Sequence, residues 1–218
     1  PNKDNMPTLK DFYNILNGMN NDVAKKLATS LDMYANGSLS VFAHKTNVNT
    51  NNRFVVYDIR DLGTPLKTFG MMAVLDQIWN RITANKEKGI NTWFYTDEYQ
   101  LLTKNEFCAE YYFQIWSRSR KYGAIPTAIT QNASTIMNSE TSSGMLANCD
   151  FALIFRQEKD DRDALQNFFN LSGNHLKQIT NSSSGNGLLY SGSSIIPFSN
   201  EIDTNSEVYK LISTKFKE

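Results

Sequence analysis

The sequence predicts an α/β fold with a mostly parallel, doubly wound sheet. Short apolar strands alternate with helices of about 10–18 residues, which is typical of parallel sheets. Two of these strands end in polar residues. Trp93–Tyr95 leads into Asp97-Glu98, and Ala124–Ala128 runs into Thr130-Gln131. Ligands of such sheets bind beyond the carboxyl ends of the strands, so the sequence predicts a functional site at this edge.

The first quarter of the chain is expected to be helical. Apolar residues recur with helical spacing through residues 8–35, and Asn36-Gly37 is a natural helix end. Residues 54–59 are β-branched and aromatic, which predicts a short strand, and the apolar stripe of residues 66–82 predicts a helix with a buried face. We expect residues 1–52 to form a helical segment inserted in or packed on one α/β core of residues 53–218.

The remaining elements alternate in the same way. Residues 105–122 are expected to form a helix that Gly123 ends, and residues 132–148 a broken helix and loop. The aromatics Trp79, Trp93, Trp116, Tyr111 and Tyr112 have core-like spacing. The last predicted elements are a strand at 151–155, a helix at 160–169, and strands near 188–190 and 194–198.

Composition excludes several classes of protein. The 22 basic and 22 acidic residues balance, so no global charge favours nucleic acid or anionic lipid. Cys108 and Cys149 stand outside any metal-ligand pattern, and His44 and His175 lack neighbouring ligands. No run approaches the roughly 20 apolar residues that a transmembrane helix needs. Pro1 in place of an initiator Met suggests a piece of a longer protein.

The Asp97-Glu98 pair suits nucleotide hydrolysis. In P-loop ATPases an Asp at the end of such a strand holds the magnesium shell, and an adjacent Glu can polarise the attacking water. The bland alternative is two acids that cap a strand end. No Gly-x-x-x-x-Gly-Lys-Ser/Thr motif and no Gly-Lys dipeptide occurs in the chain. The sequence therefore indicates an ATPase core without its phosphate-binding loop.

Blocks of residues along nearly the whole chain resemble one family in their order. They are Pro7-Thr8-Leu9, Asp11-Phe12-Tyr13 with Ile15-Leu16, Gly37-Ser38-Leu39 with Phe42, Thr46-Asn47-Val48, Tyr57-Asp58-Ile59-Arg60-Asp61-Leu62, Asp97-Glu98, Arg120-Lys121-Tyr122-Gly123, Thr130-Gln131 and Gly185-Asn186-Gly187-Leu188. The chain resembles the C-terminal ATPase domain of the VirB-type conjugation and type IV secretion ATPases. That family is the large cytoplasmic motor, fourth in the VirB series, and the resemblance is closest to its Gram-positive conjugative-element type.

The resemblance implies a RecA-like P-loop NTPase core that uses ATP and Mg²⁺ and assembles as a hexamer. It also implies a cytoplasmic, peripheral location at the inner face of the cell membrane. Partners there would be proteins of the secretion or conjugation apparatus, with DNA contacted indirectly if at all. The family's phosphate-binding loop and its strand would lie upstream of Pro1. The strand at Ala124–Ala128 would then keep an unpaired edge where that missing strand belongs.

The resemblance also implies roles for individual residues. Asp97 would be the magnesium-shell ligand, Glu98 the catalytic carboxylate and Gln131, after Thr130, the sensor of the γ-phosphate. An amide both donates and accepts hydrogen bonds, so Gln131 could contact the water and a phosphate oxygen. The alternative for Gln131 is a turn residue leaving a strand.

A basic residue from a neighbouring subunit would complete the site. Arg120 is preferred within the cluster of Arg118, Arg120 and Lys121, although cations near a helix end also offset the helix dipole. Arg156 and Arg162 are further candidates, and Arg162 lies among acids that favour a surface ion pair instead.

Gly187 could let the backbone approach a nucleotide, whereas Asn186-Gly187 is also a strong hairpin-turn signal. Two other functions stay open for the chain as a whole. One is a non-catalytic interaction module of a secretion system, and the other is a related DNA-translocating ATPase of the coupling-protein type.

Overall fold

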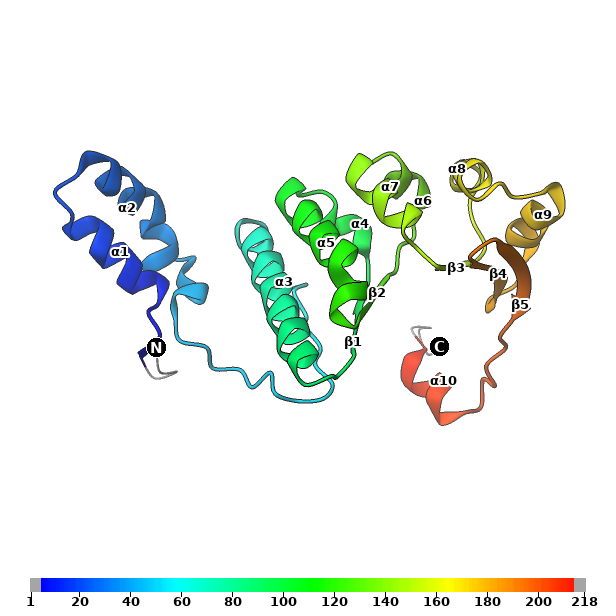
Figure 1. Cartoon of the computed structure of the whole chain (residues 1–218), viewed down its shortest axis with the longest axis horizontal. Coiled ribbons are helices and arrows are strands. Elements are labelled where there is room, and N and C mark those ends of the chain that lie inside the picture. Colours follow the sequence, from blue (N-terminus) through cyan, green and yellow to red (C-terminus); the bar gives the residue numbers. More distant parts are fainter. Residues whose placement is uncertain (1–4, 214–218) are drawn as a thin grey trace, which may run out of the picture. The chain divides into compact units, whose positions relative to one another are not determined.

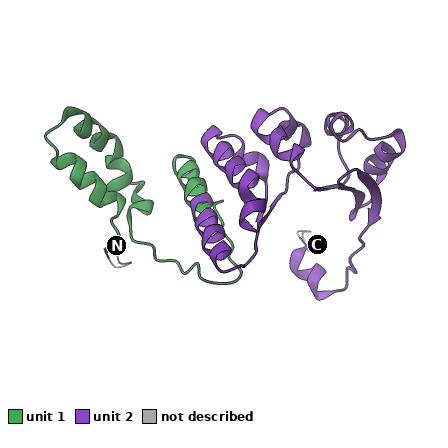
Figure 2. Ribbon diagram, in the orientation of Figure 1, with its two compact units in different colours: residues 1–74 green, residues 75–218 purple. Residues whose placement is uncertain are grey.

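The structure is a computed structural model that describes residues 5–213 (Figure 1). It divides into two compact units inside a long helix. One compact unit extends to Val74 and the other begins at Leu75 (Figure 2). The division falls within α3 (Thr64–Glu87). This helix confirms the one expected at residues 66–82. The boundary predicted between residues 52 and 53 lies within the first unit and stays a prediction.

The first unit begins with the predicted helices. α1 (Leu9–Gly18) starts at a capping box between Thr8 and Asp11, and α2 (Asp22–Ala35) starts at Asn21. A short 3-10 helix, η2 (Ser40–Ala43), follows. The two helices pack through Leu16, Ala24 and Ala28. The small alanine side chains allow this close approach, whereas the larger apolar residues Val23 and Leu27 of α2 are exposed.

The strand predicted at residues 54–59 is wrong, because this segment is bend and irregular chain. Phe54 and Val56 are exposed, and no strand of the described chain pairs with them. β-branched and aromatic residues favour a strand only where a pleated, half-buried surface receives them. Asp58 instead forms a local turn with Arg60, whose backbone N–H lies 3.0 Å from the carboxylate.

The second unit contains the predicted parallel pair. β1 (Thr92–Thr96) and β2 (Ala124–Ala128) run in register, from Thr92 beside Ala124 to Thr96 beside Ala128. The crossover consists of α4 (Tyr99–Leu102), α5 (Glu106–Ser119) and the 3-10 helix η3 (Arg120–Tyr122). Within residues 5–213, β2 pairs with no strand other than β1, which agrees with the expected unpaired edge.

α5 covers one face of this pair. Phe94 is buried against Tyr112, with ring centroids 6.1 Å apart, and Tyr112 is itself fully buried. Side chains alternate between the faces of a strand, so Trp93 and Tyr95 lie on the other face. They are 61% and 65% exposed, so the expectation of a core position for Trp93 is wrong.

The other strands form a separate antiparallel sheet in the order β3-β4-β5. These are β3 (Phe151–Ile154), β4 (Asn186–Ser191) and β5 (Ser194–Ser199). The α/β class and the parallel pair match the predicted fold, whereas the expectation of a mostly parallel sheet does not extend to these three strands. The tight turn at Gly192, where φ is +61°, joins β4 to β5, and so short a connection requires antiparallel pairing.

Helices complete the second unit. The broken helix expected at 132–148 is α6 (Ala133–Met137) and α7 (Glu140–Ala147), and α8 (Lys159–Phe169) fulfils the next prediction. α9 (Gly173–Asn181), which begins at a capping box formed by Ser172 and His175, was not predicted. α10 (Glu207–Ile212) is the last element. A core of α8, α9 and the antiparallel sheet contains Ile154, Leu165, Phe169, Leu171, Ile179 and Leu188.

Between residues 5 and 213, no helix is both long and apolar enough to span a bilayer.

Candidate functional site

The carboxyl ends of β1 and β2 stay joined beyond the strands. The backbone N–H of Ile129 donates to the carbonyl of Thr96 at 2.8 Å, and that of Tyr99 donates to the carbonyl of Ile129 at 2.9 Å. These two hydrogen bonds continue the parallel ladder beyond the ends of β1 and β2. The segments with Asp97-Glu98 and Thr130-Gln131 are therefore held side by side, as the sequence predicts for this sheet edge.

Glu98 has a left-handed backbone, with φ 50° and ψ 42°. A residue with a Cβ pays about 1–2 kcal/mol for this conformation. The Asp97 carboxylate accepts the Glu98 N–H at 2.9 Å, which supports the sharp turn from β1 into α4. Sparsely populated backbone conformations concentrate at functional sites, so this turn favours a functional reading of the acidic pair.

The buried side chain of Tyr99 holds the turn in place. Its side chain is fully buried, and its hydroxyl lies 3.2 Å from the Ser142 Oγ and 3.0 Å from the Met145 Sδ. Burial raises the pKa of Tyr99, so the phenol stays neutral. The residue after Glu98 is thus fixed in the core of α5 and α7, and the Glu98 backbone has little freedom to relax.

Two amides hold the Glu98 carboxylate. The Gln131 Nε2 donates to its Oε1 at 2.6 Å, and the Gln100 Nε2 donates to its Oε2. Gln100 in turn accepts a hydrogen bond from the Thr130 hydroxyl at 2.9 Å. The structure thus brings Glu98, Thr130 and Gln131 together, as predicted. The sequence analysis missed Gln100, for which the only signal was its place two residues after the Glu.

Asp97 is exposed beside this cluster. No group of three or more His, Cys, Asp or Glu residues in the described part of the chain could hold a metal by itself. Magnesium usually takes one or two carboxylates together with nucleotide phosphates and waters. The donors at this edge therefore fit a magnesium ion that arrives with a nucleotide, and they do not fit a protein-only metal site.

Arg120 lies at the opposite end of the parallel pair. It precedes β2 in η3, whereas Gln131 follows β2, and five strand residues at about 3.3 Å each separate these ends. Its neighbour Arg118 lies over the Trp79 ring, 6.0 Å from the centroid. Arg120 is exposed and does not join the Glu98 cluster of the same chain. Any role in hydrolysis would have to be in a neighbouring subunit.

Arg156 and Arg162 form no hydrogen bond or ion pair with the Glu98 cluster among the described residues. Arg156 is exposed after β3. Arg162 is half-buried and donates from Nη1 to the Thr180 hydroxyl at 2.5 Å, while the adjacent Asp161 accepts the Ser134 N–H at 2.7 Å. Arg162 thus packs toward α9, and the ion pair suggested by its acidic neighbours does not form among the described residues.

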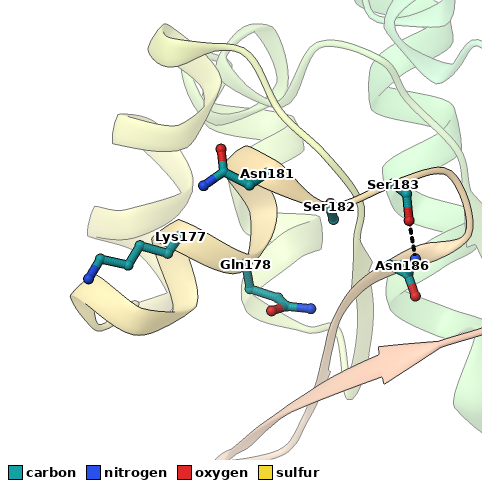
Figure 3. A pocket seen from close by; sticks show the side chains of 6 residues that line it. All are labelled: Lys177, Gln178, Asn181, Ser182, Ser183 and Asn186. Carbon is teal, nitrogen blue, oxygen red and sulfur yellow. Dashed lines mark hydrogen bonds between the residues drawn. The ribbon is translucent and has the colours of Figure 1, made fainter.

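Gly187 has a structural reason to be glycine. A Cβ at this position would lie 2.3 Å from the Ile154 carbonyl oxygen, because β4 approaches β3 closely there. Its neighbour Asn186 lines an open pocket of about 270 Å³ with Lys177, Gln178, Asn181, Ser182 and Ser183 (Figure 3). The Asn186 amide donates to the Ser183 hydroxyl across one side of it. The pocket shares no residue with the Glu98 cluster.

Comparison with known proteins relates the chain to a solved structure. No protein-family profile matches the chain. No curated protein matches it either. Among solved structures, VirB4 of Thermoanaerobacter pseudethanolicus superposes with a TM-score of 0.78 at 23% sequence identity over 93% of this chain. The chain therefore has the fold of that protein, and it spans 57% of that protein's length.

Proposed function

We propose that this chain is part of the ATPase domain of a VirB4-type motor in conjugation or type IV secretion. The observation that carries the proposal is the contact between Glu98 and Gln131, 2.6 Å apart, at the carboxyl edge of a parallel pair in a chain with a VirB4 fold. ATP hydrolysis by the whole protein would drive pilus assembly or the transfer of DNA or protein. The chain alone would be inactive, since it contains no Gly-Lys phosphate-binding motif.

The cluster can divide the work of hydrolysis among its residues. Bound magnesium would neutralise charge on the transferring phosphate. Asp97 would hold the shell of that ion, and Glu98 would orient the attacking water and accept its proton. Gln131, with Thr130 before it, would contact the γ-phosphate, because its exposed amide can exchange Glu98 for a phosphate oxygen.

The remaining parts of the site would come from another segment of the longer protein and from a neighbouring subunit. A phosphate-binding strand would pair with the open edge of β2. A cation from a neighbouring subunit of a hexamer would stabilise the transition-state charge. Arg120 is our preferred cation because it is exposed, and exposed Arg156 ranks next. Arg162 ranks last, because it already donates a hydrogen bond to the Thr180 hydroxyl. Gly187 would contact the nucleotide through its backbone, and only with β4 kept close to β3.

The proposed place of work is the cytoplasmic face of the inner membrane, beside proteins of the secretion apparatus. One observation favours a second function. The absent Gly-Lys motif would equally suit a non-catalytic module that docks to secretion proteins. A coupling-protein type of DNA-translocating ATPase would share the Asp-Glu and Gln residues but not the blocks from Pro7 to Leu62.

The Glu98→Gln variant tests the proposal in the longer protein of which we propose this chain is a part. Turnover of ATP should fall at least about 100-fold, because the amide cannot accept the proton of the water. Binding of ATP should persist, because Glu98 does not hold the nucleotide. Steady-state hydrolysis and nucleotide titration measure the two quantities. Hydrolysis at the wild-type rate would show that Glu98 is not the catalytic carboxylate.

A further inference from the structure

We propose that Gln100 is a positioning residue that fixes the carboxylate of Glu98 for attack by water. The inference rests on the proposed ATPase function. Gln100 lies in α4, two residues after Glu98, and is only 9% exposed. Its Nε2 donates to Oε2 of Glu98 and its Oε1 accepts from the Thr130 hydroxyl. One buried side chain thus bridges the chain segments that leave β1 and β2.

The orientation of the Gln100 amide follows from its partners. The Thr130 Oγ1 accepts the backbone N–H of Asn132 at 3.2 Å, and its own hydrogen has a nearer acceptor in the Gln100 Oε1, at 2.9 Å, than in the Asn132 carbonyl, at 3.5 Å. The amide oxygen therefore faces the hydroxyl and the amide nitrogen faces the carboxylate. The reversed amide would place its oxygen against Glu98, where two acceptors would repel each other. The hydrogen bonds therefore all run in one direction, from the Asn132 N–H through Thr130 and Gln100 to the Glu98 carboxylate.

The two amides on Glu98 differ in how easily they can leave. Gln131 is exposed, so water or phosphate can replace it at Oε1 without leaving a buried group unpaired. Gln100 is buried, and its departure would break bonds to both Glu98 and Thr130. A buried polar group that is left unpaired destabilises the folded state. Gln100 is therefore the lasting partner that holds Oε2, while Oε1 is the oxygen that meets the water.

The experiment compares ATP hydrolysis by the longer protein with Gln100→Met and Gln100→Glu, beside Gln114→Met. The Met variant removes the donor at similar size, and we expect kcat to fall roughly 10- to 100-fold, the effect of a displaced catalytic group. The dissociation constant of the nucleotide should stay within about twofold, since Gln100 acts only through Glu98. Gln114 is an exposed residue of α5, so its variant should match the wild type.

Gln100→Glu separates positioning from packing. It keeps the shape of the side chain and an acceptor for Thr130, but it sets a second carboxylate against Glu98, so its kcat should fall further than that of Gln100→Met. Wild-type kcat in Gln100→Met, with Glu98→Gln inactive, would overturn this inference and leave the ATPase proposal standing. Equal losses in both Gln100 variants, with a matching fall in thermal stability, would also overturn it. Wild-type turnover in Glu98→Gln would instead overturn the ATPase proposal itself.

Discussion

At the residue scale, the candidate site depends on a few side chains that local contacts hold in unusual conformations. Glu98 has a left-handed backbone and a carboxylate bound by two amides, and Tyr99 next to it is locked in the core. The sequence could predict that Asp97, Glu98 and Gln131 lie at one edge of the sheet, because each comes shortly after an apolar strand. It could not predict the bridge through Gln100, because that contact depends on the three-dimensional register of β1 and β2.

A half-buried thiol, that of Cys149, gives a test of its surroundings at the same scale. Burial, with a smaller effect from the Asp150 charge, raises the pKa of Cys149 from 9.0 to about 11. The folded state therefore favours the neutral thiol. This contribution to stability is complete below pH 9 and is lost as the pH rises to about 11.

We expect the free energy of unfolding of this chain to fall more steeply over that range than that of the Cys149→Ala variant. Urea denaturation at pH 8, 9, 10 and 11 measures the difference. Parallel curves for the two proteins would show that the half-buried surroundings of Cys149 do not raise its pKa.

At the element scale, close approaches of the backbone decide which glycines are replaceable. Gly187→Ala should destabilise the chain by about 1–3 kcal/mol, since its Cβ would meet the Ile154 carbonyl and β3 and β4 would have to separate. Gly173→Ala in the first turn of α9 is the control. No atom lies within 4 Å of a Cβ there, so this change should be neutral or stabilising. Thermal unfolding compares the two, and equal melting temperatures would exclude the structural role of Gly187.

Some of these elements were predictable from the sequence, and others were not. The helices of residues 8–35 and the strands β1 and β2 were predictable from periodicity and turn residues. Residues 54–59 have strand composition but find no partner strand, so local preference fails there. β4 and β5 are antiparallel because a tight turn joins them, and β3 also pairs antiparallel with β4, whereas alternation with helices had indicated parallel pairing. Pairing direction is a property of connections and long-range contacts, which a single strand does not encode.

At the scale of the whole molecule, the chain has a VirB4 fold over 93% of its length and covers 57% of that relative. In the proposed function it would supply the acidic and amide half of a hydrolytic site, and its β2 has an open edge among the described residues. The proposal requires that the phosphate-binding half belongs to the same polypeptide, so nucleotide binding is a property of the longer protein.

Calorimetric titration of Mg²⁺-ATP into this chain and into the longer protein tests this claim most directly. We predict binding by the longer protein alone, with no heat of binding for residues 1–218, because one carboxylate edge without a phosphate-binding loop cannot hold a triphosphate. Absence of binding by both proteins would contradict the motor assignment and leave the chain as a docking module of a secretion system.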